Sequence, residues 1–254
     1  MPLNQGLLEQ RRAAYRYPPA CVRRHPSPPT PLLPKYPYTV DDPQSSGWST
    51  TPALLPSVRL DAYHHGLLHS ACPQDQFDGV LSIVYWGHFA KRTGAHNPYA
   101  LSRTRWLLKG KRGRRRRTVA FVSRRVTEAR NCLAASPPNL RRAIEALDEI
   151  AFIGPSFASK ILAFMDPQRC AVLDAVILHQ LHCSADADLR AITKDAAGFE
   201  AWCVRCLDTA AILNACSSTW TDWDGAPQRW RAVDVERAVF HHAALKCDPA
   251  ELLV

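Results

Sequence analysis

One segment of the chain, Leu147 to Leu181, constrains the fold most, because it holds two apolar helical stretches separated by only a few residues. The first stripe of apolar residues at helical spacing ends at Ile150. Gly154 and Pro155 then predict a tight turn, and an apolar helix follows at once. The pattern predicts a helix-hairpin-helix, whose turn presents unpaired backbone N–H groups and the positive end of the second helix to a phosphate group.

Apolar residues recur at helical spacing over most of the chain beyond residue 60. One stripe runs from Phe77 to Tyr85, and a cleaner one from Leu140 to Ile150 is opened by Asn139. Further helices are expected over Ser156–Met165, Ala175–Leu181, Phe199–Ala215 and Val233–Leu245. We therefore expect a mainly α fold.

Proline dominates the beginning of the chain, where twelve of the twenty prolines fall before position 57. Each proline removes a backbone donor and restricts the residue before it, so interior helix or sheet is not expected there. Tyr36, Tyr38, Leu54 and Leu55 favour packing of this segment along its own domain over docking to a proline-reading module. We expect an extended Pro-rich N-terminal arm over residues 1–60 and one domain over residues 61–254.

The compartment follows from composition. The 254 residues include no run of about 20 apolar residues, the length that a membrane helix needs. Arg11, Arg12 and Pro18 stand where a signal peptide would be apolar. Nine cysteines, an odd number scattered along the chain, favour reduced thiols over a disulfide framework. We therefore expect a cytoplasmic protein without a membrane partner.

Positive charge is concentrated in one block of the chain. Residues 79–127 contain thirteen Lys and Arg residues and no acidic residue, and without this block the net charge of +9 becomes −4. Such a pattern is typical of a polyanion-binding site rather than of a generally cationic surface. Gly110 and Gly113 interrupt the basic run from Lys109 to Arg117 and predict a loop there.

Asp174 follows the hairpin at an informative distance. It lies twenty residues after Gly154, and Val172 and Val176 flank it. This arrangement resembles the helix-hairpin-helix DNA glycosylase superfamily, in which a GxG hairpin is followed at that distance by a catalytic aspartate in a V-D-x-x-V context.

The resemblance covers roughly Phe77 to Leu245 through the stretches YWGHFAKR, IGPSFASKILAF, FEAWC and WRAVDVERAVF, which look like a bacterial branch with the 8-oxoguanine DNA glycosylase fold. It implies a two-lobed architecture, with a hairpin lobe over residues 78–170, a second lobe over residues 61–77 plus 171–254, and a cleft between them. The branch includes an anti-phage glycosylase that removes a glucosylated hydroxymethylcytosine. By this analogy, phage-modified DNA is a candidate substrate.

Two residues depart from the superfamily pattern. Phe152 replaces the first hairpin glycine, and because a bulky residue resists a positive φ, this argues against the usual turn conformation. Ser156 occupies the position at which bifunctional members have the lysine that attacks the sugar. The resemblance therefore implies a monofunctional enzyme that uses water and leaves an uncut abasic site. Lys160, about 6 Å further along the same helix face, is a secondary candidate for that amine.

Cleavage of an N-glycosidic bond builds positive charge on the sugar. An ionised carboxylate beside the sugar stabilises this charge and orients or deprotonates the attacking water. We expect Asp174 in this catalytic role, with Lys160 and Ser156 as possible secondary participants. An aspartate before a helical stretch is also an ordinary N-cap, and the two roles are compatible.

Base excision from a duplex requires flipping of the nucleotide, and phosphate contacts compensate for the lost stacking and pairing. By the family pattern, Tyr85, Trp86 and His88 are candidates for the base-flip wedge or pocket, with Asn97 as a weaker one. Tyr85 and Trp86 are equally well explained as core aromatics. The expected DNA contacts are Ile153, Gly154, Ser156, Arg103, Arg105, Lys109, Lys111, Arg112, Arg114 and Arg115.

Cys203 and Cys206 form a CxxC pair, but their spacing to Cys183 and Cys216 does not match the four-cysteine signature of the iron–sulfur cluster in some relatives. We therefore expect buried thiols, no metal and no organic cofactor. The expected partner is double-stranded DNA carrying a modified base, bound by a monomer in the bacterial nucleoid.

Two alternatives stay open. One is an 8-oxoguanine DNA glycosylase/lyase of base excision repair that acts through Lys160. The other is a non-catalytic helix-hairpin-helix protein that keeps the hairpin as a phosphate clamp on DNA. The sequence does not identify the excised base.

Overall fold

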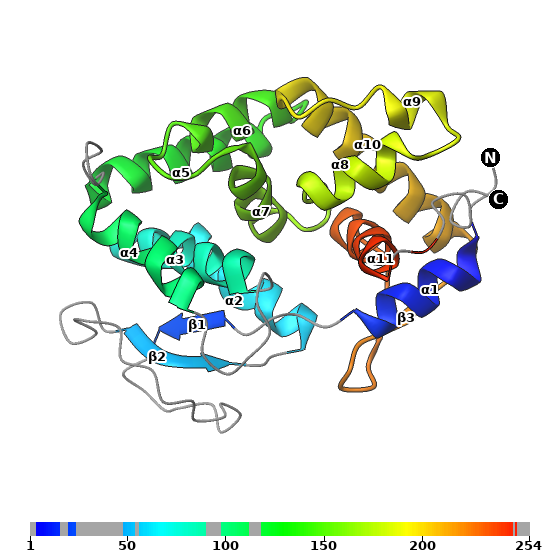
Figure 1. Ribbon diagram of the computed structural model, residues 1–254, viewed down its shortest axis with the longest axis horizontal. Coiled ribbons are helices and arrows are strands. Elements are labelled where there is room, and N and C mark those ends of the chain that lie inside the picture. The colour runs from blue at the N-terminus through cyan, green and yellow to red at the C-terminus, as the bar shows by residue number, and fades with distance from the viewer. Residues whose placement is uncertain are drawn as a thin grey trace. The chain divides into compact units, whose positions relative to one another are not determined.

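The structure, a computed structural model, describes residues 4–15, 20–23, 48–53, 56–89, 98–111, 118–245 and 247. In this part of the chain the fold is mainly helical, with eleven helices and two short antiparallel sheets of two strands each (Figure 1). The expected mainly α class is confirmed. The chain divides into two compact units: the first unit is Met1–Arg16 with Arg125–Val254, and the second unit is Tyr17–Arg124. Residues 78–124 and 125–170, which we expected in one lobe, fall in different units.

The first unit contains the hairpin and the C-terminal helices. Its helices are α1 (Gln5–Ala14), α6 (Leu140–Asp148), α7 (Pro155–Met165), α8 (Ala175–His182), α9 (Ala187–Arg190), α10 (Ala196–Ala215) and α11 (Ala232–Ala244). β3 (Trp220–Thr221) pairs with β4 (Pro227–Gln228). α6 packs on α7 and α10, while α11 packs on α1, α8 and α10. α5 (Val119–Ala134) begins in the second unit and ends in the first.

The second unit combines a strand pair with three helices. β1 (Ala20–Arg23) and β2 (Trp48–Ala53) are antiparallel, with a register irregularity between Cys21 and Arg23. α2 (Ser57–His69), α3 (Pro73–Phe89) and α4 (Pro98–Lys109) follow, and α3 packs on α2, α4 and β1. The apolar stripe of α3 is buried, as its helical spacing predicted: Phe77, Val80, Leu81, Val84 and Tyr85 are all at most 6% exposed.

The helices expected from apolar spacing are present, and capping side chains begin some of them, whereas α7 and α11 begin without a side-chain cap. Asn139 begins α6 by accepting a hydrogen bond from the backbone N–H of Arg142 at 3.0 Å. α10 begins at Ala196 rather than at the expected Phe199, because Asp195 caps it by accepting from the N–H of Gly198 at 2.8 Å. In α10 the polar cap therefore extends the helix beyond its apolar stripe.

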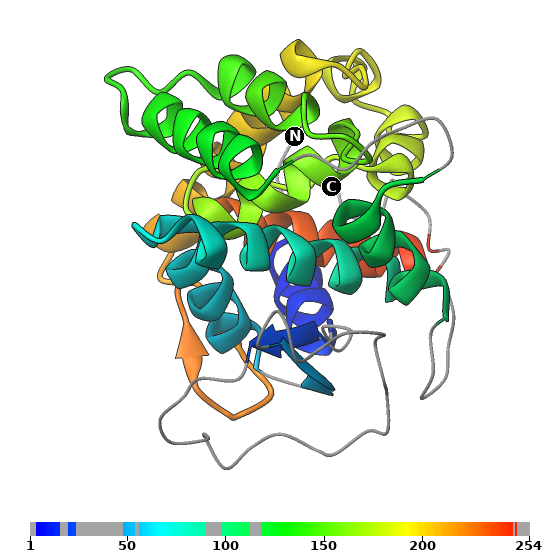
Figure 2. The same cartoon turned by 90° about the vertical axis from the view of Figure 1, so that its left-hand side faces the viewer.

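The first helix corrects part of the expectation for the N-terminal arm. Gln5–Ala14 is α1 and not an extended segment, because no proline lies between Pro2 and Pro18 and Asn4 caps the helix by accepting from the N–H of Leu7 at 3.1 Å. α1 lies beside α11 in both views of the molecule (Figures 1 and 2). Tyr36, Tyr38, Leu54 and Leu55, which suggested packing of the arm, lie outside the described residues.

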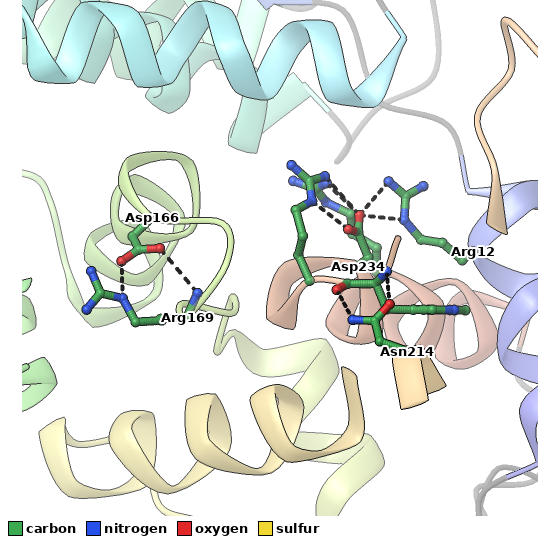
Figure 3. Close-up of polar contacts among 8 residues, drawn as sticks. Arg12, Asp166, Arg169, Asn214 and Asp234 are labelled. Atoms are coloured by element: carbon green, nitrogen blue, oxygen red, sulfur yellow. Dashed lines mark hydrogen bonds and ion pairs between the residues drawn. The ribbon is translucent and has the colours of Figure 1, made fainter. Parts of the chain in front are cut away.

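A buried ionic cluster fastens α1 to α11. Asp234 is fully buried, and its carboxylate accepts from Arg12 at 2.8 and 2.9 Å, from Arg231 at 2.6 Å and from Arg237 at 3.3 Å (Figure 3). The Arg12 guanidinium also lies 3.5 Å from the ring centroid of Trp220. Since a buried charge is tolerated only when it is paired and hydrogen-bonded, this cluster specifies how α1 docks on α11.

Among the residues that the structure describes, no helix combines the length and the apolar character needed to cross a membrane.

Candidate active site

The hairpin turn between α6 and α7 keeps the left-handed conformation that Phe152 was expected to resist. Phe152 has φ 70°. The turn is closed by a hydrogen bond from the N–H of Ile153 to the carbonyl of Ile150 at 3.0 Å, and both isoleucine side chains are buried. Packing on both sides of the turn therefore outweighs a backbone strain of order 1–3 kcal/mol. The positive φ that the bulk of Phe152 put in doubt is therefore present.

The turn leads into the start of α7, where backbone N–H groups can donate hydrogen bonds. Gly154 is the N-cap and Pro155 occupies the first helical turn. Within the described part of the chain, no acceptor bonds to the N–H of Gly154 or of Ser156, whereas the N–H of Ile153 bonds to Ile150. A Cβ added at Gly154 would meet no atom within 4 Å, so the backbone here faces open space. Two of the three expected phosphate contacts of the hairpin thus have a free donor.

A segment without regular secondary structure, residues 170–174, leads to Asp174 and is held by hydrogen bonds from two sides. The indole N–H of Trp202 donates to the carbonyl of Val172 at 2.9 Å. The hydroxyl of Ser159 accepts from the N–H of Leu173 at 3.1 Å. Because Ser159 is on α7 and Trp202 is on α10, two helices set the position of the residue that follows.

Asp174 lies at the N-terminus of α8, and its two carboxylate oxygens have different partners. Oδ1 accepts from the backbone N–H groups of Val176 at 3.1 Å and Ile177 at 3.3 Å, which is the expected N-cap. Oδ2 lies 2.8 Å from Nζ of Lys160, whose ammonium also donates to the hydroxyl of Ser156 at 3.3 Å. The structure therefore brings the predicted catalytic residue and both secondary candidates into one cluster.

The cluster keeps the Asp174 carboxylate ionised and in contact with solvent. Burial acts to raise the pKa of Asp174, but the Lys160 ammonium and the N–H groups of Val176 and Ile177 outweigh burial and lower the pKa below its ordinary value. The Asp174 side chain is 15% exposed and that of Lys160 is 9% exposed. An ionised carboxylate that is mostly shielded from water but still reachable is suited to stabilise positive charge on a substrate.

The basic residues of the second unit are described only in part. Arg103 and Arg105 are partly buried on α4, and Lys111 is exposed. The Arg103 guanidinium lies 3.9 Å from the ring centroid of Trp106, and the Lys111 ammonium lies 4.0 Å from it. The expected contacts Arg112, Arg114 and Arg115 and the side chain of Lys109 lie outside the described residues.

The candidates for the base-flip wedge lie in the interior. Tyr85 has no exposed surface, Trp86 is 6% exposed and His88 is 7% exposed. A wedge must present its side chain to the DNA, so this burial favours the core role that was open for Tyr85 and Trp86. Asn97 lies outside the described residues.

The CxxC cysteines are buried free thiols, as expected. Cys203 and Cys206 have no exposed surface, whereas Cys183 and Cys216 are exposed. Over the described ranges, no three side chains of His, Cys, Asp or Glu are grouped so that they could hold a metal ion.

Sequence reasoning missed the residues that position Asp174. Ser159 is a polar residue in the middle of an apolar buried helix, and Trp202 stands in the FEAWC stretch, whose role was not specified. A buried polar side chain needs a hydrogen-bond partner, so Ser159 within a run of buried residues was the available signal. Its partner, fourteen residues away, is visible only in the structure.

Comparisons with known proteins identified no relative of this chain. No family model matches the chain, and no curated protein or solved structure matches it either.

Proposed function

We propose that the protein is a monofunctional DNA glycosylase, which flips a modified base out of double-stranded DNA and hydrolyses its N-glycosidic bond. One observation carries the proposal: beyond the hairpin of α6 and α7, Asp174 is held ionised and partly exposed at the N-terminus of α8. The proposal includes the two-lobed architecture of the superfamily that the sequence resembles and action as a monomer.

The chemistry assigned to Asp174 is electrostatic. As the base departs, positive charge develops on C1′ of the sugar, and a carboxylate beside it lowers the energy of that transition state. The same carboxylate orients a water molecule or accepts its proton, so that hydroxide is delivered to C1′ and an abasic site is left. Oδ1 accepts from two fixed backbone N–H groups, whereas Oδ2 contacts the ammonium of a flexible lysine side chain, so Oδ2 is the oxygen assigned to this work.

Lys160 supports this role by holding the carboxylate ionised. Its ammonium contacts Oδ2 of Asp174, and this contact offsets the burial that would otherwise favour the neutral acid.

DNA binding is assigned to the hairpin and to the basic block. The free N–H groups of Gly154 and Ser156, at the positive end of α7, are suited to one phosphate oxygen. Cationic side chains such as Arg103 and exposed Lys111 supply sequence-independent attraction through counterion release. These contacts offset the few kcal/mol needed to flip one nucleotide.

The test is a substrate panel. Purified protein is incubated with plain duplex DNA and with duplexes containing oxidised, alkylated or glucosyl-hydroxymethylated bases, and any released base is identified by mass spectrometry. Release of one modified base with an uncut abasic strand supports the proposal and names the substrate. Tight DNA binding without release from any duplex contradicts it and supports the non-catalytic phosphate clamp.

A second candidate function is that of a bifunctional glycosylase/lyase. It is favoured by the short distance between Lys160 and Asp174. Lys160 Nζ lies 2.8 Å from Asp174, so an amine is present beside the carboxylate although Ser156 replaces the usual lysine. In this reaction the neutral amine attacks C1′, the base leaves, and the resulting Schiff base permits strand cleavage.

Borohydride trapping separates the two candidates. The lyase forms a covalent protein–DNA adduct that Lys160→Ala abolishes and Ser156→Ala keeps. The monofunctional enzyme forms no adduct, and the strand stays intact after base release.

A further inference from the structure

The lysine beside Asp174 is almost completely buried. The side chain of Lys160 is 9% exposed, in the middle of the buried and largely apolar helix α7. A buried ammonium group needs hydrogen-bond acceptors around it, because it has three N–H donors and has lost most of its water. The contacts that it makes in the interior therefore determine where its charge lies.

Three groups surround this ammonium. Its Nζ lies 2.8 Å from Oδ2 of Asp174, and it donates to the hydroxyl oxygen of Ser156 at 3.3 Å. It also lies 5.5 Å from the ring centroid of Phe157, within the range of a cation–π interaction. Ser156 and Phe157 are four and three residues before Lys160, so all three side chains share one face of α7. The helix itself thus brings the serine hydroxyl to the lysine.

The position of Ser156 relative to Asp174 is also fixed by a route that does not involve the lysine. The hydroxyl of Ser159 donates to the carbonyl oxygen of Ser156 at 3.0 Å. The same hydroxyl accepts from the N–H of Leu173, the residue before Asp174, at 3.1 Å. Ser159 has no exposed surface, so water does not compete for these hydrogen bonds. The backbone of Ser156 is therefore tied to the segment that carries Asp174.

The second acceptor decides on which side of Oδ2 the ammonium lies. A single ion pair fixes the distance between the two charges but not their direction, and the flexible four-carbon stem of lysine permits many positions around a carboxylate oxygen. The Ser156 hydroxyl confines the Lys160 ammonium to the side of Oδ2 that faces α7. Because a carboxylate oxygen has two lone pairs, a second one stays available on the other side of Oδ2.

We propose that Ser156 is a positioning residue: its hydroxyl holds the Lys160 ammonium on one side of Oδ2 of Asp174 and thereby leaves the other side of this oxygen open to the sugar and the attacking water. Without the hydroxyl, the ammonium moves around Oδ2 and blocks this approach in part of the molecules. The effect on catalysis rests on the proposed function, whereas the placement of the ammonium does not.

The placement of the ammonium is tested without DNA by ¹H–¹⁵N NMR of lysine ammonium groups in protein labelled at the lysine nitrogen. The Lys160 signal is identified by its absence in Lys160→Met. We expect this signal to be protected from hydrogen exchange with water in the wild type. Ser156→Ala is expected to speed its exchange by about tenfold or more, because a hydrogen bond of a charged group is lost. Ser156→Thr keeps a hydroxyl and is expected to restore the protection.

Ser70→Ala is the matched control for this measurement. The hydroxyl of Ser70 also contacts a carboxylate, that of Asp75 at 2.7 Å, but it lies in the second unit. Its removal is expected to leave the exchange of the Lys160 ammonium unchanged. The same exchange rate in the wild type and Ser156→Ala, or faster exchange in both Ser156→Ala and Ser156→Thr, overturns the proposal.

The positioning role is tested by single-turnover base release together with duplex affinity. Ser156→Ala is expected to lower the rate about tenfold and to keep DNA affinity within a few-fold, because the backbone N–H assigned to the phosphate is retained. Ser156→Thr is expected to restore the rate. Equal rates in the wild type and Ser156→Ala, or a loss that Ser156→Thr does not restore, overturn the role. Protein that shows the NMR contrast but releases no base from any duplex contradicts the glycosylase and not the placement of the ammonium, so the two failures are distinguishable.

Discussion

The ammonium nitrogen of Lys160 lies 2.8 Å from Oδ2 of Asp174, across a separation of fourteen residues in the chain. The pair joins the middle of α7 to the N-cap of α8. It therefore links the helix that follows the hairpin to the carboxylate assigned to catalysis, and changes in one of these elements are expected to reach the other.

Replacement of Lys160 by methionine is expected to raise the pKa of Asp174. Burial already acts to raise it, and Lys160 is the main opposing group. In the wild type the lowered pKa means that ionised Asp174 stabilises the fold above the unfolded-state value of 3.8, and that this contribution is lost as the pH falls through the folded-state pKa. In Lys160→Met the loss begins at higher pH. Carboxyl ¹³C NMR of Asp174 measures the shift directly, and an unchanged titration contradicts the proposed ion pair.

Replacement of Asp234 by asparagine is expected to destabilise the protein by about 3–5 kcal/mol, because it leaves three arginines around a buried neutral group. Arg141→Ala is the control, since its ion pair with Glu200 is exposed and is worth about 0–1 kcal/mol. Urea unfolding of both variants gives the comparison. Equal effects of the two substitutions would show that the cluster does not hold α1 on α11.

Substitution by alanine is expected to reduce the stability of the protein by different amounts at two glycines. A Cβ at Gly198 would lie 1.9 Å from the carbonyl oxygen of Thr193, so Gly198→Ala is expected to cost about 1–3 kcal/mol or more. A Cβ at Gly154 meets nothing within 4 Å, and Gly154→Ala is expected to cost less than about 1 kcal/mol through its N-cap position alone. Thermal unfolding checks the order. A larger loss at Gly154 contradicts the geometry of the hairpin turn.

Removal of the exposed Lys111 ammonium is expected to weaken DNA binding uniformly across sequences. If the ammonium contacts one phosphate, Lys111→Ala reduces the slope of log affinity against log salt by about 1. Lys194→Ala is the control, because Lys194 is exposed but lies outside the basic block. Fluorescence anisotropy with a labelled duplex at several salt concentrations measures both slopes. Identical slopes for the two variants exclude a phosphate contact of Lys111.

Local patterns in the sequence predicted most of the helical structure. The spacing around Leu140 to Leu147 and the Gly154–Pro155 turn located α6 and α7, because apolar periodicity and turn chemistry are local properties. Phe152 shows the limit of local rules. Its residue type disfavours φ 70°, and the buried isoleucines on either side override that preference only in the folded chain.

The candidate site was predictable where it depends on spacing. The resemblance to the glycosylase superfamily singled out Asp174 by its distance to Gly154, and its N-cap role followed from the helical pattern after it. The contacts of Ser159 with Leu173 and of Trp202 with Val172 come from two different helices and have no sequence signature. Such contacts depend on tertiary packing and become visible only when the helices are placed in space.

The central claim is that the Asp174 carboxylate carries the chemistry of base release. The most direct measurement compares single-turnover base release by the wild type and Asp174→Asn on the duplex identified by the substrate panel, together with the affinity of both proteins for that duplex. The account predicts a loss of rate of about 100-fold or more with DNA affinity retained within a few-fold, because the amide keeps the shape of the side chain but not its charge. A rate in Asp174→Asn close to that of the wild type would contradict it.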